Sequence, residues 1–275
     1  MTDFQALIFG LIQGFTEFLP VSSSGHLVLA QQLFGLSGDL MTFDIFVHFG
    51  TLLAVLAVFY NSILSILLGC WTGLKSLLLE KQSPSYIYQN SYYVRLATAL
   101  LVGTVPAGIV GIALKNQIEA LFSTTIPVLA ALFVTGSVLL ITFLVKKGES
   151  HIGLWRGLVV GIAQAIAIIP GISRSGSTIS TALFLKVNRQ EAGEFSFLLS
   201  IPAILGATVL AIHDFTAITS SVPLHAIIIG TVSSFISGLF SLKILMNIVR
   251  RGKIGYFSFY CFAIVITGAV YLYLR

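Results

Sequence analysis

Long runs of apolar residues without charge dominate this chain. Only 9% of its 275 residues are charged, whereas 56% are hydrophobic. An ordinary soluble domain carries about 25% charged residues, so this chain has too few to cover a globular surface. A soluble enzyme, a disordered protein and a repeat solenoid are therefore excluded. The fold class that we predict is an all-α, polytopic membrane protein.

Six apolar stretches are long enough to cross a bilayer, because a hydrocarbon core of about 30 Å needs roughly 20 residues of helix. The expected spans are Ile45–Leu74, Leu96–Leu114, Ile126–Val145, Phe195–Ile212, Ala226–Leu242 and Ile254–Leu274. The stretch Ile45–Leu74 is too long for one crossing unless it is tilted or extends beyond the membrane.

Two further apolar regions are shorter, and each is interrupted by a proline and a serine-rich turn. Phe4–Leu19 ends at Pro20, and Gly153–Ile169 ends at Pro170. After each turn a second short apolar run follows. We predict that each region is a re-entrant helical hairpin, which enters the membrane and returns to the same side. The alternative is a kinked full span, since proline is tolerated in membrane helices.

The two interrupted regions align with each other at an offset of 151 residues, which indicates an internal repeat. Five of the sixteen aligned positions are identical, all of them small or polar. We predict one integral-membrane domain, 1–275, with repeats of about 1–145 and 150–275. Each repeat holds one hairpin followed by three spans, and an odd number of crossings inverts the second copy. The identical pairs are Gly10 and Gly161, Gln13 and Gln164, Ser22 and Ser173, Ser24 and Ser175, and Gly25 and Gly176.

The basic residues are distributed unevenly between the loops of this arrangement. On the side of the N-terminus the loops carry only Lys115 and Arg275, whereas twelve basic residues lie on the other side. Cytoplasmic loops are the positively charged ones, so both termini are predicted to face outward. With so few charged residues, a net charge of +5 does not indicate a nucleic-acid-binding surface, and no nucleic-acid partner is expected. The twelve are Lys75, Lys81, Arg95, Lys146, Lys147, Arg156, Lys186, Arg189, Lys243, Arg250, Arg251 and Lys253.

Ionisable residues at membrane depth indicate function, and Glu17 is the first of them. It follows Asp3 by fourteen residues, which is about 21 Å of helix and places it near the midplane. Gln13 shares its helix face. Oxygen-bearing side chains of this kind suit Mg²⁺ or Ca²⁺, so Glu17 and Gln13 are predicted metal ligands. The alternative is that Gln13 bonds a neighbouring helix and Glu17 pairs with Arg174.

Each serine-rich turn precedes a half-helix, whose N-terminal N–H groups favour an anion. Arg174 adds a planar guanidinium suited to phosphate. A single turn of this kind is usually only a helix cap, but two such turns with a membrane arginine indicate phosphate binding. The expected phosphate-binding residues are Ser22, Ser24, Gly25, Ser173, Arg174, Ser175, Gly176 and Thr178.

His26 directly follows the first serine turn, where a serine nucleophile such as Ser23 would need a base. The catalytic candidates are therefore Ser23, His26, Glu17 and Arg174. Asp44 and His48 share a helix face, and we interpret them as structural, with a role at the site entrance as the alternative. Together the candidates describe phosphoryl chemistry, and a site between membrane helices implies a substrate with a lipid tail.

The segments Gln13–His26 and Pro170–Gly176 closely resemble the two signatures of the undecaprenyl-diphosphatase, or bacitracin-resistance protein, family. The likeness extends over the whole chain in length and span order. It implies a phosphatase of the bacterial cytoplasmic membrane that converts undecaprenyl diphosphate to undecaprenyl phosphate with a divalent cation, recycles the carrier for peptidoglycan synthesis and confers bacitracin resistance. Its site would open to the outer side.

By the same resemblance, Gln13 and Glu17 form the amide and acidic pair, Ser23 and His26 are nucleophile and helper, and Arg174 clamps phosphate. Some family members have glutamate where this chain has Gln13, which makes the role of Gln13 less certain. Which of Ser23 and His26 forms a phospho-enzyme, if either does, is left open, as is a homodimer. The alternative function is an inverted-repeat transporter or flippase of lipid phosphates.

Overall fold

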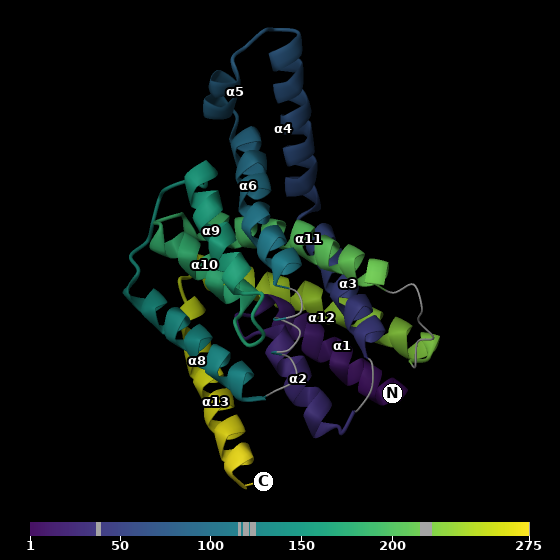
Figure 1. The fold of residues 1–275 in the computed structure, drawn as a ribbon. Coiled ribbons are helices and arrows are strands. Elements are labelled where there is room, and N and C mark those ends of the chain that lie inside the picture. The colour runs from purple at the N-terminus through teal and green to yellow at the C-terminus, as the bar shows by residue number, and fades with distance from the viewer. Residues whose placement is uncertain (37–39, 115–116, 118–120, 122–124, 215–221, 275) are drawn as a thin grey trace.

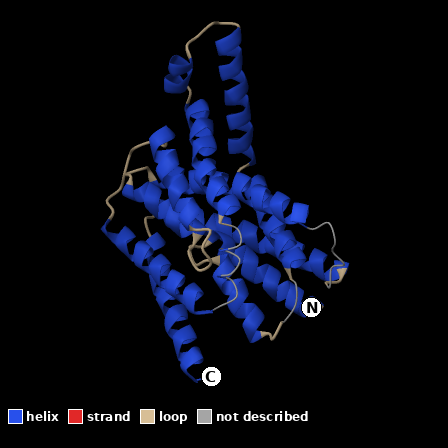
Figure 2. Cartoon of the chain, viewed as in Figure 1, coloured by secondary structure: helices blue, strands red, loops and turns tan. Residues whose placement is uncertain are grey.

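The computed structural model describes residues 1–36, 40–114, 117, 121, 125–214 and 222–274. In these ranges the regular structure is helical, apart from an isolated bridge between Ser150 and Val187 (Figure 2). The all-α class is thereby confirmed. The α-helices are α1 (Asp3–Phe18), α2 (Ser23–Leu33), α3 (Met41–Val58), α4 (Tyr60–Leu78), α5 (Pro84–Asn90), α6 (Tyr92–Ala113), α8 (Thr125–Ile141), α9 (Leu154–Ile166), α10 (Arg174–Phe184), α11 (Arg189–Asp214), α12 (Leu224–Arg250) and α13 (Phe257–Leu274), with short 3₁₀ turns η1 (Thr142–Leu144) and η2 (Ile254–Tyr256).

Six helical segments in the described ranges are long and apolar enough to cross a membrane, which confirms a multi-pass membrane protein. Five of them overlap the last five predicted spans. The sixth is Tyr60–Leu78, which overlaps only the second part of the predicted first span.

The prediction of one continuous span over Ile45–Leu74 is wrong, because the chain forms two helices there. α3 ends at Val58 and α4 begins at Tyr60, with Phe59 as the junction at φ −102° and ψ 17°. α3 packs against α12, whereas α4 and α5 project away from the bundle (Figure 1). Apolar composition alone does not reveal this break, since both helices are apolar. The two helices differ in their packing: α3 packs extensively against α12, and α4 does not.

Each of the two interrupted regions forms a pair of helices joined by a turn; the return of each pair to the same side of the membrane stays a prediction. In the first, α1 ends at Phe18 and α2 begins at Ser23; in the second, α9 ends at Ile166 and α10 begins at Arg174. The serines before α2 and α10 act as N-caps, a position that serine favours. Ser22 accepts a hydrogen bond from Gly25 N, and Ser173 accepts one from Gly176 N.

Each hairpin packs against the second span of the other half of the chain. α1 makes its main contact with α12, and α9 makes its main contact with α6. The aligned glycines permit this close approach: a Cβ at Gly10 would lie 1.9 Å from Ser233 Oγ, and one at Gly161 would lie 2.2 Å from Gly103 O. Small residues let membrane helices approach closely, which explains why these two glycines are shared by the repeats.

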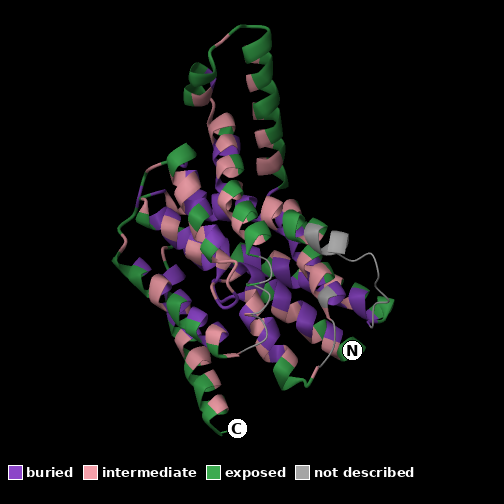
Figure 3. Cartoon of the chain, in the orientation of Figure 1, coloured by how far each residue is buried: buried purple, intermediate pink, exposed green. Residues whose placement is uncertain are grey.

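Burial is concentrated where the hairpins meet α11 and α12, in the middle of the molecule (Figure 3). The candidate spans that contain α4 and α13 are apolar and yet largely exposed, with only 6% and 11% of their residues buried. Such surfaces suit lipid, in which an apolar face needs no cover. Lys115 and Arg275, on which the predicted orientation partly depends, lie outside the described residues.

Candidate active site between the two helical hairpins

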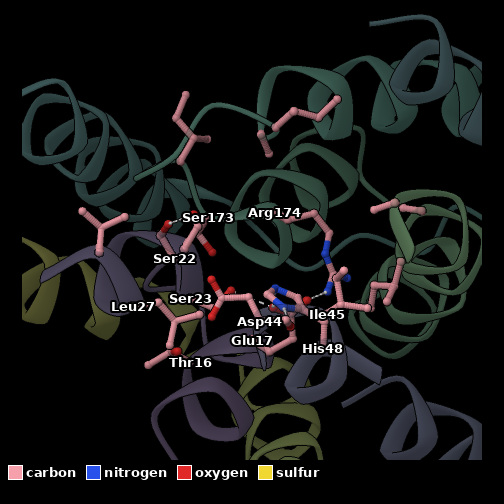
Figure 4. Close-up of a pocket in the computed structure, with 18 of the residues that line it drawn as sticks. Thr16, Glu17, Ser22, Ser23, Leu27, Asp44, Ile45, His48, Ser173 and Arg174 are labelled. Carbon is pink, nitrogen blue, oxygen red and sulfur yellow. Dashed lines mark hydrogen bonds and ion pairs between the residues drawn. The ribbon is translucent and has the colours of Figure 1, made fainter. Parts of the chain in front are cut away.

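A cavity of about 650 Å³ lies between the two hairpin turns, α3 and α11 (Figure 4). One part of its wall is polar and comes mainly from the end of α1, the two turns with the first residues of α2 and α10, and α3. The rest is apolar and comes from α2, α3, the 167–172 turn and α11. The polar lining residues are Thr16, Glu17, Ser22, Ser23, Ser24, Gln31, Asp44, His48, Ser173, Arg174 and Thr208.

Glu17 is at the centre of the polar part, and both of its carboxylate oxygens accept hydrogen bonds. Arg174 donates through Nη2 to Oε1 at 2.7 Å, and Ser23 donates through Oγ to Oε2 at 2.6 Å. The side chain of Glu17 is 7% exposed and that of Arg174 15%. A charge pair this deep is costly to break, by about 3–5 kcal/mol when one partner is removed.

The ion pair of Glu17 and Arg174 joins the two hairpins, since the residues come from α1 and α10. Figure 4 shows the Arg174 side chain reaching across the cavity toward Glu17. From the sequence, this ion pair is the alternative to a metal-binding role for Glu17. The contact uses Nη2; Nη1 lies 3.5 Å from the Ser196 carbonyl.

Gln13 lies beside Glu17 but outside the cavity. It is fully buried, and its Nε2 donates to Glu17 Oε2 at 3.0 Å. The amide oxygen has no hydrogen-bond partner among the described residues. With nitrogen toward the carboxylate, Gln13 supports Glu17 in this conformation; its predicted role as a metal ligand stays a prediction.

The two serine turns are tied to one another and to α8. Ser22 Oγ accepts a hydrogen bond from Gly171 N at 3.2 Å. Thr135, on α8, donates to Gly171 O and accepts from Ser173 N, both at 3.0 Å. These bonds hold the second turn from two sides. Thr135 was not singled out in the sequence, because nothing local marks a threonine that bonds a turn 36 residues away.

Several predicted phosphate-binding groups are engaged within the protein. The N–H groups of Gly25 and Gly176 donate to the capping serines. Ser175 Oγ lies 3.3 Å from Ser173 Oγ, and Thr178 Oγ1 lies 2.5 Å from Ser196 Oγ. None of these four residues lines the cavity, whereas Ser22, Ser24, Ser173 and Arg174 do. Their roles toward phosphate remain predictions.

His26 does not contact Ser23 by any hydrogen bond of the described residues. Its Nδ1 lies 2.8 Å from the Ser22 carbonyl, and its Nε2 lies 2.8 Å from the Tyr260 hydroxyl. The His26 and Tyr260 rings are stacked with centroids 5.6 Å apart. Because a carbonyl only accepts, Nδ1 carries the proton and the Tyr260 hydroxyl donates to Nε2. His26 therefore faces α13 and does not line the cavity.

The imidazole that does line the cavity belongs to His48. Its Nε2 lies 3.8 Å from Glu17 Oε2, and its Nδ1 lies 2.7 Å from the Asp44 carbonyl. The carboxylate of Asp44 also lines the cavity, and Gln31 Nε2 lies 3.5 Å from it. The spacing of Asp44 and His48 on one helix face was the only signal in the sequence for their position at the site.

The donor set fits a hard divalent cation that is completed by substrate. Carboxylates of Glu17 and Asp44 line the same cavity. Among the residues that the structure describes, no three His, Cys, Asp or Glu side chains form a metal cluster. Mg²⁺ is usually bound by one or two carboxylates, with waters and substrate phosphates as the other ligands; a cation at this site stays a prediction.

The fold and the cavity define a multi-pass membrane protein with a charged site enclosed between two helical hairpins. The model of the bacitracin resistance protein BacA family matches residues 6–267, and the chain belongs to this family.

Relatives similar to the chain over nearly its full length carry the name undecaprenyl-diphosphatase. That of Salinibacter ruber is 39% identical over 266 residues, which cover 96% of this chain and 97% of the relative. That of Carboxydothermus hydrogenoformans is 40% identical over 273 residues, covering 97% and 96%. That of Korarchaeum cryptofilum is 42% identical over 273 residues, covering 98% and 97%.

Proposed function

We propose that this protein is an undecaprenyl-diphosphatase, which hydrolyses undecaprenyl diphosphate to undecaprenyl phosphate and inorganic phosphate. The observation that carries the proposal is the chain of contacts from Ser23 through Glu17 to Arg174. It joins a serine hydroxyl, a carboxylate and a guanidinium in one cavity with partly apolar walls. In the proposal these groups act as nucleophile, base and phosphate ligand. The full-length similarity to proteins of that name supports it.

In the reaction that we propose, Ser23 Oγ attacks the terminal phosphorus and its proton passes to the carboxylate of Glu17, to which the hydroxyl is already hydrogen-bonded. The bond from that phosphorus to the bridging oxygen breaks, and undecaprenyl phosphate leaves. Water then hydrolyses the phosphoserine, releases inorganic phosphate and restores the Ser23 hydroxyl. Arg174 binds the non-bridging oxygens, since stabilising developing charge is the main task in phosphoryl transfer.

We further propose that a divalent cation, Mg²⁺ or Ca²⁺, binds with the substrate at Glu17 and Asp44. When bound, the cation would neutralise charge on the diphosphate. The chain's own residues supply the rest: Arg174 orients the phosphate and the capping serines hold the two turns together. The apolar wall from α11, with Ala203, Ile204 and Ala207, would contact the first part of the lipid tail.

The arrangement in the membrane is also a proposal. Two inverted repeats are supported by the reciprocal packing of α1 on α12 and of α9 on α6. In a bacterial cytoplasmic membrane the twelve basic residues would face the cytoplasm, and both termini and the mouth of the cavity would face outward. Through recycling of the lipid carrier, the enzyme would serve peptidoglycan synthesis and confer bacitracin resistance.

The test is release of inorganic phosphate from undecaprenyl diphosphate by the purified protein in detergent, with Mg²⁺ or Ca²⁺ present. We expect phosphate release from the native chain and none from a Glu17→Gln variant prepared in parallel. A native chain that binds the lipid but releases no phosphate under either cation would contradict the proposal.

A second candidate function, movement of lipid phosphates across the bilayer, is favoured by the reciprocal packing of the hairpins, which is typical of inverted-repeat transporters. A Ser23→Ala variant reconstituted in vesicles separates the two functions. Transfer of a labelled lipid diphosphate between leaflets by this variant would support transport; its absence, with hydrolysis by the native chain, would leave the phosphatase alone.

A further inference from the structure

His48 is held in one orientation by its own helix. Its Nδ1 lies 2.7 Å from the carbonyl of Asp44, one helical turn before it. Because a carbonyl only accepts, Nδ1 must carry a hydrogen. A neutral His48 ring therefore presents the lone pair of Nε2 to its surroundings. Histidines that bind metals are commonly fixed in this way, with the other ring nitrogen donating to a backbone carbonyl.

The Nε2 atom of His48 faces Glu17 Oε2 across 3.8 Å, in the polar part of the cavity. This distance is too long for a direct hydrogen bond, for which about 2.7–3.2 Å is usual. Two electron-rich atoms thus face each other with a gap between them. Both are fixed by hydrogen bonds, His48 by the Asp44 carbonyl and Glu17 by Arg174, Ser23 and Gln13, of which Ser23 and Gln13 donate to Oε2 itself.

The width of this gap matches the separation of two ligands on one cation. Two atoms that each lie about 2.1 Å from a metal are about 3.0 Å apart at a right angle and about 4.2 Å apart when they are opposite. The observed 3.8 Å lies between these limits. We propose that His48 Nε2 and Glu17 Oε2 together bind the divalent cation of the site, an inference that rests on the proposed function.

An imidazole ligand changes which cations the site prefers. Carboxylates, waters and phosphate oxygens suit Mg²⁺, Ca²⁺ and Mn²⁺, whereas imidazole suits transition metals. A site with Glu17, His48 and substrate oxygens therefore binds Mn²⁺ more tightly than Mg²⁺ or Ca²⁺. His26 does not have this capacity, because both of its ring nitrogens are engaged with Ser22 and Tyr260.

The test uses Mn²⁺ alone with the full-length protein in detergent. Spin-echo modulation of bound Mn²⁺ detects a nitrogen bonded directly to the metal, and we expect this signal from the native chain. In His48→Gln the nitrogen signal disappears and the Mn²⁺ dissociation constant rises roughly tenfold or more, the scale on which changes around a metal site act. The matched control is His225→Gln: His225 is exposed, pairs with Asp3 and does not line the cavity. Its change should leave both readouts as in the native chain.

Bound Mn²⁺ without a nitrogen signal would overturn the inference, and so would unchanged Mn²⁺ affinity in His48→Gln or the absence of Mn²⁺ binding. The measurement on the native chain does not depend on how the variant folds. Phosphate release with Mg²⁺, measured on the same samples, separates this inference from the proposed function. Hydrolysis without a nitrogen signal refutes only the role of His48, and a nitrogen signal without hydrolysis refutes only the phosphatase.

Discussion

The side-chain hydroxyl of Ser22, in the first hairpin turn, accepts a hydrogen bond at 3.2 Å from the backbone N–H of Gly171, in the second. The same oxygen caps α2 through Gly25 N. Ser22 adopts φ +66°, in the left-handed region, which costs an L-residue of order 1 kcal/mol. This strained backbone occurs at the residue whose hydroxyl connects the two turns next to Ser23 and Arg174.

Removal of the Ser22 hydroxyl should therefore separate the two turns. We expect Ser22→Ala to lose about 1–3 kcal/mol of stability, because two buried N–H groups lose their acceptor. Ser22→Gly should lose less, since glycine adopts a positive φ without strain. Thermal unfolding of both variants in the same detergent measures the difference. Equal losses would show that backbone conformation at position 22 contributes nothing.

Thr135 should act as a positioning residue for the second turn. Thr135→Val keeps the shape but removes the bonds to Gly171 O and Ser173 N. We expect kcat to fall roughly ten- to hundredfold with little change in KM, because small displacements of positioned groups are costly. Thr135→Ser should restore most of the rate. Thr142→Val is the control, since the hydroxyl of buried Thr142 donates to Leu139 O, within its own helical turn. A similar fall in the control would indicate general loss of packing.

Ser23 and Glu17 should behave as one unit, and His26 should not belong to it. Ser23→Ala and Glu17→Gln should each remove nearly all turnover, and the double variant should be little worse than the worse single one, as for groups that act together. His26→Ala should cost less, because its ring bonds Ser22 and Tyr260 and not Ser23. Single-turnover hydrolysis measures all four. A loss in His26→Ala as large as that in Ser23→Ala would restore His26 as the base.

Arg174→Lys distinguishes a phosphate-binding role from simple neutralisation of Glu17. Lysine keeps the charge but lacks the planar guanidinium, so we expect a loss of about 2–4 kcal/mol in transition-state stabilisation, by analogy with an oxyanion donor. Hydrolysis and thermal stability should be measured together. A stable and fully active Arg174→Lys enzyme would leave only the ion pair with Glu17, and Arg174→Ala combined with Glu17→Ala should then regain the stability lost in either single change.

The orientation in the membrane can be tested by cysteine labelling in intact cells. The exposed native cysteine, Cys70, is first replaced by serine; Cys261 is buried. We expect Thr2→Cys to react with an impermeant reagent from outside and Glu80→Cys, between α4 and α5, to react only after permeabilisation. The reverse pattern would contradict the proposed topology.

The helical membrane class, the two helix breaks and the position of Glu17, Ser23 and Arg174 at these breaks were predictable from local sequence. The length of an apolar run, a proline and a serine-rich turn can each be read from a short stretch of sequence, and a charged residue within an apolar run is easily recognised. The break at Phe59 was not predictable, because the residues on both sides of it are apolar and uncharged. It depends on which helix packs against α12.

The sequence by itself determined that this chain enters a membrane, since composition requires no knowledge of contacts, and the alignment of the two interrupted regions predicts that its halves are related. Only the tertiary structure decided which groups meet. It placed Glu17 between Ser23 and Arg174, turned His26 toward Tyr260 and brought His48 into the cavity. The physical reason is that hydrogen bonds and ion pairs act within about 3–4 Å, and such distances between residues far apart in the chain are set by helix packing.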